Sequence, residues 1–194
     1  MKTQLRKEVL KRRSALTASE VATKSKAILD RLLTLEAYRS ASFIMTYLNF
    51  RNEVETTMLV QEAMADGKKI VVPVTDMVNR RLIPSLVEHF PGDLEVGTMN
   101  ILEPKGNALR LCNPLWIDLV IVPGVVFDLQ CYRIGYGGGF YDRFLPLIRP
   151  GAVTVGLAFE LQIVERFEHG QYDVPVDYVL TEDRVISASS VVDN

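Results

Sequence analysis

The sequence contains little cysteine and histidine, and it has no long uninterrupted hydrophobic segment. Its two cysteines, Cys112 and Cys131, form no CxxC pair and have no histidine nearby, which argues against a zinc site and against a disulfide framework. The longest apolar run, Ile117 to Phe127, is interrupted by an aspartate, a proline and a glycine, so it is too short to span a bilayer. We therefore expect a protein of the reducing cytoplasm with no membrane partner.

The sequence also lacks a strong charge imbalance and a nucleophilic triad. Its formal net charge is −2, so there is no general attraction to nucleic acid or to anionic lipid. Its two histidines, His89 and His169, lie in polar, turn-like contexts and are expected at the surface. Charged residues begin at Lys2, so we expect no signal peptide. We expect residues 1–194 to form a single globular domain, acting as a monomer.

The most unusual segment is Arg133 to Asp142, which holds four glycines in five positions. Glycine reaches positive φ freely and exposes main-chain N–H groups, so this run suits an anion such as a phosphate group. A Walker A motif is excluded because Phe140 and Tyr141 follow the last glycine. Phe140 also takes the place that glycine or alanine needs in a dinucleotide-binding fingerprint.

The residues that flank these glycines strengthen the phosphate interpretation. Arg133 adds a fixed positive charge, and Asp142 is near enough to hold a hard cation against a bound phosphate. An apolar stripe from Phe140 to Ile148 predicts a helix directly after the glycines. The alternative is a flexible glycine-rich turn followed by a helix-capping aspartate.

The first residues predict a basic amphipathic helix from Lys2 to Leu16. Apolar residues form one stripe, and Lys2, Arg6 and Arg13 repeat on another. In most proteins such a basic face is simply solvated. The alternative, which the sequence leaves open, is that the helix brings cations to a polyanionic ligand.

Strands and helices alternate along the rest of the chain, which predicts a mostly parallel sheet with helices on both faces. Predicted strands are residues 41–50, 69–74, 80–87, 117–122, 152–159 and 178–181. Predicted helices are residues 18–33, after a capping box at Thr17 to Glu20, 56–66 and 161–167, and residues 89–114 are expected to be loop-rich. The fold class is a three-layer, Rossmann-like α/β fold, similar to the sugar-phosphate isomerase and CoA-transferase type.

Ligands of such sheets collect beyond the carboxyl ends of the strands. This rule predicts that the residues after Phe50, the loop after Val122 and the acids around Asp177 come together.

Arg133 to Asp142 closely resembles the signature of the 5-formyltetrahydrofolate cyclo-ligase family, also called methenyltetrahydrofolate synthetases. The resemblance covers nearly the whole chain. Besides the basic N-terminal helix, it includes residues 47–56, 97–104, 122–128, 156–159 with Gln162, and 176–181. Two positions depart from the family pattern: Cys131 stands where a turn glycine is usual, and Gly138 stands where some members have lysine.

The resemblance implies an ATP- and Mg²⁺-dependent ligase that cyclises 5-formyltetrahydrofolate to 5,10-methenyltetrahydrofolate and releases ADP and phosphate. In the implied mechanism the formyl oxygen is phosphorylated, nitrogen 10 attacks the formyl carbon, and phosphate leaves. Phosphoryl transfer needs alignment and charge neutralisation more than a protein nucleophile, which fits the absence of a triad.

Site residues follow from the resemblance position by position. Implied ATP-binding residues are Lys2, Thr3, Gln4, Leu5, Arg6, Arg133, Ile134, Gly135, Tyr136, Gly137, Gly138, Gly139, Phe140 and Tyr141. Arg133 and Tyr141 are the implied catalytic residues, Leu48 and Glu53 the substrate-binding residues, and Asp142 and Asp177 the magnesium-binding residues. Phe140 and Tyr141 are expected either to flank the folate or to belong to the core.

Two other classes of function remain open at this point. One is a folate- or nucleotide-binding module without catalysis on the same scaffold. The other is a sugar-phosphate isomerase or acyl-CoA transferase on a similar sheet, which would need no ATP.

Overall fold

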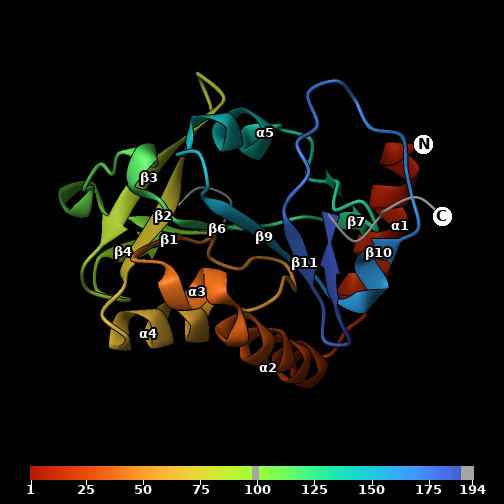
Figure 1. Cartoon of the computed structure of the whole chain (residues 1–194), viewed down its shortest axis with the longest axis horizontal. Helices are drawn as coiled ribbons and strands as arrows, with labels where there is room; N and C mark the ends of the chain where they lie inside the picture. The colour runs from red at the N-terminus through yellow and green to blue at the C-terminus, as the bar shows by residue number, and fades with distance from the viewer. Residues whose placement is uncertain (98–100, 189–194) are drawn as a thin grey trace.

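A seven-stranded sheet forms the centre of the computed structural model, which describes residues 1–97 and 101–188 (Figure 1). The strand order is β12 (Val185–Ser187), β11 (Tyr178–Leu180), β9 (Val153–Leu157), β6 (Leu119–Val122), β1 (Phe43–Met45), β2 (Lys69–Asp76) and β3 (Arg81–Val87). The strands from β11 to β2 run parallel, and both edge strands pair antiparallel with their neighbours. The predicted α/β class with a mostly parallel sheet is therefore confirmed.

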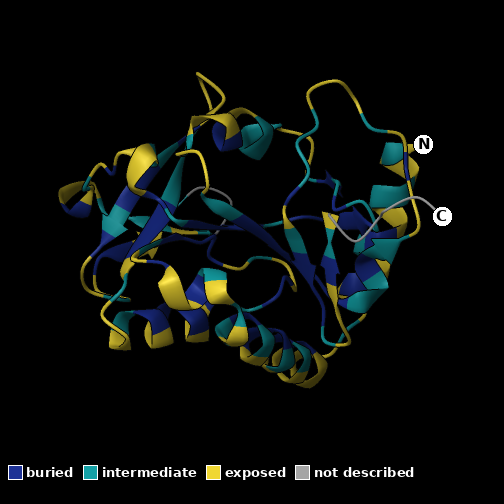
Figure 2. Cartoon of the chain, viewed as in Figure 1, coloured by how far each residue is buried: buried dark blue, intermediate teal, exposed yellow. Residues whose placement is uncertain are grey.

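Strand β6 is the central strand, as its composition predicts. All four of its residues are buried, because the strand is covered on both faces of the sheet. Figure 2 shows that burial is concentrated in the inner strands and in the sides of the helices that face them.

Helices α2 (Ala18–Thr34), α3 (Glu36–Ser40) and α4 (Thr57–Ala65) cover one face of the sheet, and α5 (Phe140–Phe144) lies on the other (Figure 1). The predicted capping box begins α2, where the Thr17 side chain accepts from the N–H of Glu20 and the Glu20 carboxylate accepts from the N–H of Thr17. Val21, Ile28 and Leu32 then point into the core.

Helix α1 (Lys2–Ser14) packs beside a second, three-stranded sheet made of β10 (Ile163–Val164), β7 (Val126–Asp128) and β8 (Arg133–Ile134). Val9 of the helix is buried with Val126 and Ile134 of this sheet. Because β8 leads directly into the glycine-rich segment, this packing places the basic helix next to it.

Three predicted elements differ from the structure. The predicted helix over 161–167 is a 3₁₀ turn, η5 (Glu160–Gln162), followed by β10, because the buried Gln162 amide donates to the carbonyl oxygens of Gly124 and Val125. Helix α5 ends at Phe144, since Pro146 lies in the 3₁₀ turn that follows, η4 (Leu145–Leu147). The strand predicted over 41–50 is ordered as a strand only from Phe43 to Met45.

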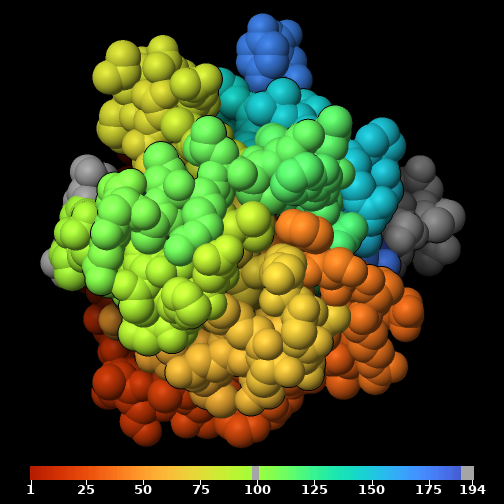
Figure 3. Space-filling view, turned by 90° about the vertical axis from the view of Figure 1, so that its left-hand side faces the viewer, coloured from red at the N-terminus to blue at the C-terminus, as the bar shows by residue number. Residues whose placement is uncertain are grey.

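The segment predicted as loop-rich contains 3₁₀ turns and a short hairpin of β4 (Leu94–Val96) and β5 (Leu102–Pro104). Residues 98–100 of the 97–104 turn, and residues 189–194 of the tail, lie outside the described residues. Further along, the N–H of Leu86 donates to Arg110 and the N–H of Cys112 donates to Pro84, so this chain segment covers the edge strand β3. Figure 3 looks onto this edge, with β3 and the segment that follows it above α3 and α4.

Within the described ranges, 1–97 and 101–188, no helix has the length and apolar character that a membrane span requires.

Candidate active site

A cavity of about 540 Å³ opens at the carboxyl ends of β1, β2 and β6. Its walls come from the turn after β1, the β2–β3 hairpin, helix α1 and the glycine loop, which we define as Gly135 to Gly139. Its apolar lining residues, which we call the apolar wall, include Leu48, Phe50, Met77, Leu82, Leu102 and Pro123. Its charged lining residues, which we call the charged wall, include Lys2, Arg6, Glu53, Arg133, Asp142 and Asp173. The cavity thus has one wall for a flat apolar group and one for an anion with a cation.

The glycine loop has the geometry that its composition predicts. Gly137 has a φ of 104° and Gly139 a φ of 64°, both in the left-handed region that favours glycine. In the part of the chain that the structure describes, no main-chain N–H from Gly135 to Gly139 donates a hydrogen bond. These N–H groups are therefore available to a bound anion.

Arg6 of α1 lies along the glycine loop. Its Nε donates to the carbonyl oxygen of Gly135 at 2.7 Å. Its Nη2 lies 3.9 Å from the point where a Cβ of Gly137 would stand. The helix therefore brings a guanidinium to the glycine loop, and its contact with a polyanionic ligand stays a prediction.

Arg133 is buried at the base of the loop, with 7% of its surface exposed. Nη1 donates to the carbonyl oxygen of Val174 at 2.7 Å, and Nη2 donates to Oδ1 of Asp142 at 2.8 Å. Burial lowers the pKa of Arg133, and the neighbouring Asp142 opposes that shift. Arg133 and Asp142 thus form an ion pair on the charged wall of the cavity.

Glu53 is a buried carboxylate of the charged wall, with 6% of its surface exposed. Oε2 accepts from the N–H of Phe50 at 2.9 Å, and Oε1 accepts from the hydroxyl of Tyr136 at 2.9 Å. Burial raises the pKa of Glu53, while Arg13 and these hydrogen bonds act in the opposite direction. Leu48 is buried beside it in the same turn.

Tyr141 lines the cavity with a hydroxyl that has no hydrogen-bond partner among the described residues, although the atom is buried. Burial raises the pKa of Tyr141, and Glu53 raises it further while Arg133 lowers it. An orphaned buried hydroxyl between these two groups indicates a donor that a ligand would satisfy.

A second cavity of about 640 Å³ adjoins the first and shares Gly139, Asp142 and Asp173 with it. Its outer wall includes Gln171 and Tyr172. The space around the glycine loop therefore extends past Asp142 as well as toward Glu53.

Comparison with known proteins assigns nearly the whole chain to one family. The family model described as the 5-formyltetrahydrofolate cyclo-ligase family matches residues 1–182. The chain belongs to this family. The 5-formyltetrahydrofolate cyclo-ligase of Escherichia coli is 29% identical over 178 residues, covering 91% of this chain and 98% of that protein. The 5-formyltetrahydrofolate cyclo-ligase of Haemophilus influenzae is 30% identical over 178 residues, covering 91% of this chain and 95% of that protein.

A solved structure shows the same relationship in three dimensions. The solution NMR structure of Aquifex aeolicus 5,10-methenyltetrahydrofolate synthetase has a TM-score of 0.85 and 31% identity, covering 100% of this chain and 95% of that chain. The methenyltetrahydrofolate synthetase from Mycoplasma pneumoniae has a TM-score of 0.76 at 23% identity, covering 93% of this chain and 98% of that chain, and so shows the shared fold alone.

The structure explains both departures from the family pattern. Cys131 adopts a φ of 64°, the left-handed conformation that a turn glycine would take freely. Burial raises the pKa of this thiol to about 12, so it is not a reactive group. At Gly138, a Cβ would lie 2.4 Å from the ring of Phe140, so lysine there would require the ring to move. Arg143 instead places a cation there, with Nη2 donating to the carbonyl oxygen of Gly138 at 2.5 Å.

The structure brings most of the implied site residues of the family to the cavity. Lys2, Arg6, Leu48, Glu53, Asp142 and all of residues 133–141 line it. Thr3 and Gln4 are exposed and are not among the lining residues, and Leu5 packs in the core cluster of Val9 instead. Phe140 lines the cavity and also packs against the core, while its contact with the folate stays a prediction.

Asp177 does not lie where the edge rule predicted. It directly precedes β11, which runs parallel to β9, so it is at the amino end of these strands. Oδ2 accepts from the main-chain N–H and the hydroxyl of Thr154 at 2.7 and 2.8 Å. The expectation is therefore wrong for Asp177 itself, while Asp173, four residues earlier, pairs with Lys2 and lines the cavity. Binding of magnesium by Asp177 stays a prediction.

Several cavity residues were not among the predicted site residues, including Tyr47, Met77 and Asp173, and neither was Arg13, which contacts the lining residue Tyr136. Tyr47 lay within a segment that resembles the family, but Met77 and Asp173 are in loops without any distinctive pattern. Arg13 shares the basic stripe of Lys2 and Arg6, which was the signal for it.

His169 is not the surface residue that its sequence context suggested. Its ring stacks on Tyr132 at 3.7 Å between centroids, and Nε2 lies 2.7 Å from Oδ2 of the fully buried Asp128. This contact attaches the segment that precedes Asp173 to β7 and to the turn after it.

Proposed function

We propose that the chain catalyses the ATP- and Mg²⁺-dependent cyclisation of 5-formyltetrahydrofolate to 5,10-methenyltetrahydrofolate, with release of ADP and phosphate. One observation carries the proposal: the unpaired N–H groups of the glycine loop and the buried Glu53 carboxylate open on the same cavity. A phosphate group and a folate ring would thus meet in one place. The family relationship supports the same reaction.

The charged wall suits a nucleotide polyphosphate. Main-chain N–H groups of the glycine loop would donate to phosphate oxygens, and Arg6 and Lys2 would neutralise their charge. Arg133, held by the Val174 carbonyl, would stabilise the charge that develops on the transferred group. Its pairing with Asp142 keeps both groups neutralised before substrates bind.

Asp142 fits a magnesium ligand because it is a carboxylate on the cavity wall beside the glycine loop. Among residues 1–97 and 101–188, no group of three or more metal-ligating side chains is present, so most ligands would come from nucleotide and water, which suits Mg²⁺. The ion would neutralise phosphate charge. Asp177 is proposed as a second ligand from the family resemblance alone.

The apolar wall and Glu53 suit the folate. The carboxylate would accept paired N–H donors from the aminopyrimidine edge, and Leu48 and Phe50 would contact the ring faces. Tyr141 would then donate its unpaired hydroxyl to the reacting formyl group or its phosphate.

The proposed chemistry has two balanced steps. The formyl oxygen attacks the γ-phosphorus of ATP, and the bond to ADP breaks. Nitrogen 10 then attacks the formyl carbon, the carbon–oxygen bond to phosphate breaks, and nitrogen 10 loses its proton. The protein contributes alignment, charge neutralisation and exclusion of water.

The enzyme is further proposed to be a cytoplasmic monomer that acts on small molecules, with no nucleic acid or membrane partner. A non-catalytic folate- or nucleotide-binding module is the alternative, because the same cavity could bind both ligands without turnover.

Incubation with ATP, Mg²⁺ and 5-formyltetrahydrofolate tests the proposal. We expect the near-ultraviolet absorbance of the methenyl product to rise together with ADP, one for one, and no product without ATP. Ligand-dependent thermal stabilisation with no product would support the binding module. Product formed without ATP would contradict the proposed reaction.

A further inference from the structure

Arg13, near the C-terminal end of α1, is the largest fully buried side chain of the described residues and is 1% exposed. It has no direct carboxylate partner among the described residues. Instead Nη1 donates to the carbonyl oxygen of Gly124 at 3.4 Å, and Nη2 donates to that of Arg51 at 3.2 Å and to the hydroxyl of Tyr136 at 2.5 Å. A buried cation held mainly by neutral oxygens is costly, so its position calls for a functional reason.

The hydroxyl of Tyr136 connects this cation to Glu53. It accepts from Arg13 and donates to Oε1 of Glu53 at 2.9 Å. The guanidinium carbon also lies 5.9 Å from the centre of the Tyr136 ring. Because a guanidinium can only donate, the single O–H of Tyr136 is left for the carboxylate, and the direction of both hydrogen bonds is fixed.

Both oxygens of Glu53 act as acceptors, since Oε2 accepts from the N–H of Phe50. A carboxylate accepts hydrogen bonds more strongly than a neutral carboxyl group, so two donors on Glu53 favour its ionised form. The titratable groups that influence Glu53 are Arg13 of α1 and Tyr136 of the glycine loop, and Glu53 in turn affects Tyr47 and Tyr141. Arg13 is the one cation in this set.

We propose that Arg13 is a positioning residue for folate recognition, which acts through the Tyr136 hydroxyl to hold the Glu53 carboxylate ionised and oriented toward the cavity. The inference rests on the proposed function, which assigns Glu53 to the folate ring. The proposed function gives Arg13 no role, and the inference adds one. It also gives the Tyr136 side chain a role, whereas the phosphate site uses only the main-chain N–H of that residue.

The Tyr136→Phe variant tests this with the least disturbance, because the ring and the main-chain N–H remain. We expect KM for 5-formyltetrahydrofolate to rise about 5- to 30-fold, as for loss of one hydrogen bond to a charged group, while KM for ATP stays within about twofold. The acidic limb of the pH profile of kcat/KM for the folate should move to higher pH, because Glu53 loses a hydrogen bond that lowers its pKa. Equal changes in both KM values, or an unmoved acidic limb, would overturn the inference.

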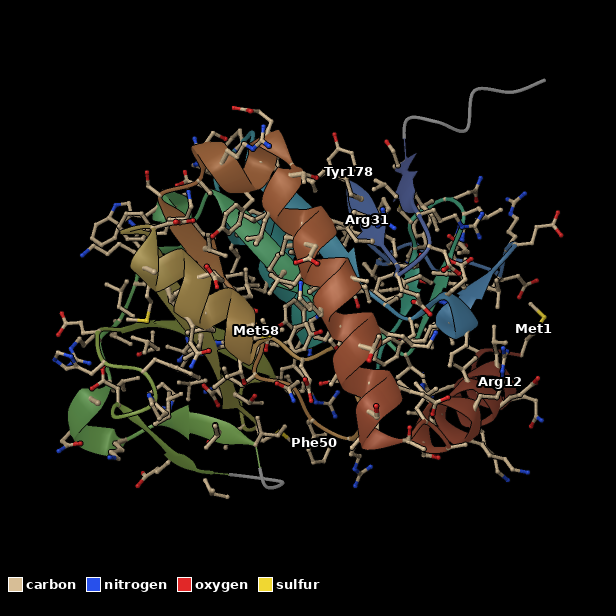
Figure 4. The ribbon with its side chains drawn as sticks, turned by 90° about the horizontal axis from the view of Figure 1, so that it is seen from below. Met1, Arg12, Arg31, Phe50, Met58 and Tyr178 are labelled. Atoms are coloured by element: carbon tan, nitrogen blue, oxygen red, sulfur yellow. The ribbon has the colours of Figure 1, made fainter. Side chains whose placement is uncertain are left out.

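Arg13→Gln is expected to act in the same direction and more strongly. Its matched control is Arg12→Gln, because Arg12 is the neighbouring arginine of the same helix but is exposed on its outer side (Figure 4). The control should keep the wild-type KM for folate. If Arg13→Gln does not fold, Tyr136→Phe still decides the question.

A double-mutant cycle tests whether Tyr136 affects folate binding through Glu53. In a Glu53→Gln background, Tyr136→Phe should change folate affinity less than about twofold, since the group that it positions has gone. Full additivity of the two substitutions would show that Tyr136 acts elsewhere and would contradict the proposal.

Carbon-13 NMR of the labelled Glu53 carboxyl group gives a readout that needs no turnover. The pH midpoint of the titration of this carboxyl group should be higher in Tyr136→Phe than in the wild type, and unchanged in Arg12→Gln. An unchanged midpoint in Tyr136→Phe would overturn the inference even if the enzyme is active. A wild type that makes no methenyl product would instead contradict the proposed function, while a higher titration midpoint in Tyr136→Phe would still show that Tyr136 controls the ionisation of Glu53.

Discussion

At the scale of single residues, the site depends on groups whose hydrogen bonding is left incomplete. The Tyr141 hydroxyl and Nε of Arg13 are the buried side-chain polar atoms without partners among the described residues. Unsatisfied buried polar atoms are rare because each costs about 1–3 kcal/mol. Two of them at one site, one on a lining residue and one on a residue that contacts the lining residue Tyr136, indicate a binding function rather than a structural one.

Tyr141→Phe is expected to separate stability from activity. Since the hydroxyl makes no protein hydrogen bond, its removal should change the free energy of unfolding by less than about 1 kcal/mol, while kcat should fall at least about tenfold if the hydroxyl contacts the reacting group. Urea denaturation and steady-state kinetics measure the two effects. Tyr47→Phe is the control: its hydroxyl donates to the Val54 carbonyl at 3.1 Å, so it should lose about 1–2 kcal/mol.

Asp142→Asn and Asp177→Asn are expected to differ. The first should slow turnover and raise the Mg²⁺ concentration needed for half-maximal rate, because a neutral amide is a weaker ligand. The second replaces the carboxylate that accepts two Thr154 hydrogen bonds at the start of β9 with a neutral, weaker acceptor, so it should also lower thermal stability. Kinetics over a Mg²⁺ titration and thermal melts distinguish them. Full activity of Asp142→Asn at every Mg²⁺ concentration would exclude Asp142 as a magnesium ligand.

At the scale of elements, the glycine loop and the β2–β3 hairpin both line the cavity. Arg143 of α5 joins them, because Nε donates to the carbonyl oxygen of Arg80 in the hairpin and Nη2 to that of Gly138 in the loop. The hairpin in turn brings Met77 to the apolar wall. The shape of the site therefore depends on backbone conformation in both turns.

Gly137→Ala tests the backbone conformation of the loop. With a φ of 104° an alanine is strained, so we expect a loss of about 1–2 kcal/mol and a higher KM for ATP. Gly135→Ala is the matched control for stability, since its φ is not in the left-handed region and nothing lies within 4 Å of the added Cβ. Equal unfolding midpoints for the two variants would contradict the assigned role of Gly137.

The hairpin gives a pH-dependent prediction. Hydrogen bonds from Asn79, together with Arg81, lower the pKa of Asp76 from 3.8 to about 2. A folded-state pKa below the unfolded value contributes stability above pH 3.8 that is lost as the pH falls toward 2. Asp76→Asn should therefore be less stable than the wild type at pH 7, with a difference that shrinks between about pH 4 and 2. Urea midpoints across this range measure it, and a constant difference would contradict the prediction.

At the scale of the whole molecule, sequence patterns predicted the elements whose signals are local. The capping box defined the start of α2, and unbroken burial identified β6 as central. They did not predict β7 and β8, which are only three and two residues long and depend on pairing with each other and with β10. Nor did they place Asp177 correctly, because the end of the sheet at which a residue lies depends on the exact boundaries of its strand. The expected roles of individual site residues came from the family resemblance, because the periodicity of apolar residues predicts secondary structure and not function.

Residues 1–194 are predicted to unfold as one cooperative domain. The single tryptophan, Trp116, lies near the start of β1, 6.1 Å from the ring of Phe43, and reports tertiary structure there. Far-ultraviolet circular dichroism measures the helix content, which comes from other parts of the chain. Coincident urea midpoints from the two probes are expected, and separated midpoints would indicate more than one folding unit.

The measurement that tests the central claim most directly is a crystal structure with a non-hydrolysable ATP analogue, Mg²⁺ and 5-formyltetrahydrofolate. The account predicts the terminal phosphate on the N–H groups of the glycine loop, within reach of Arg6 and Arg133, and the folate ring against Leu48 with its aminopyrimidine edge on Glu53. A triphosphate bound elsewhere, with the glycine loop free of ligand, would contradict it.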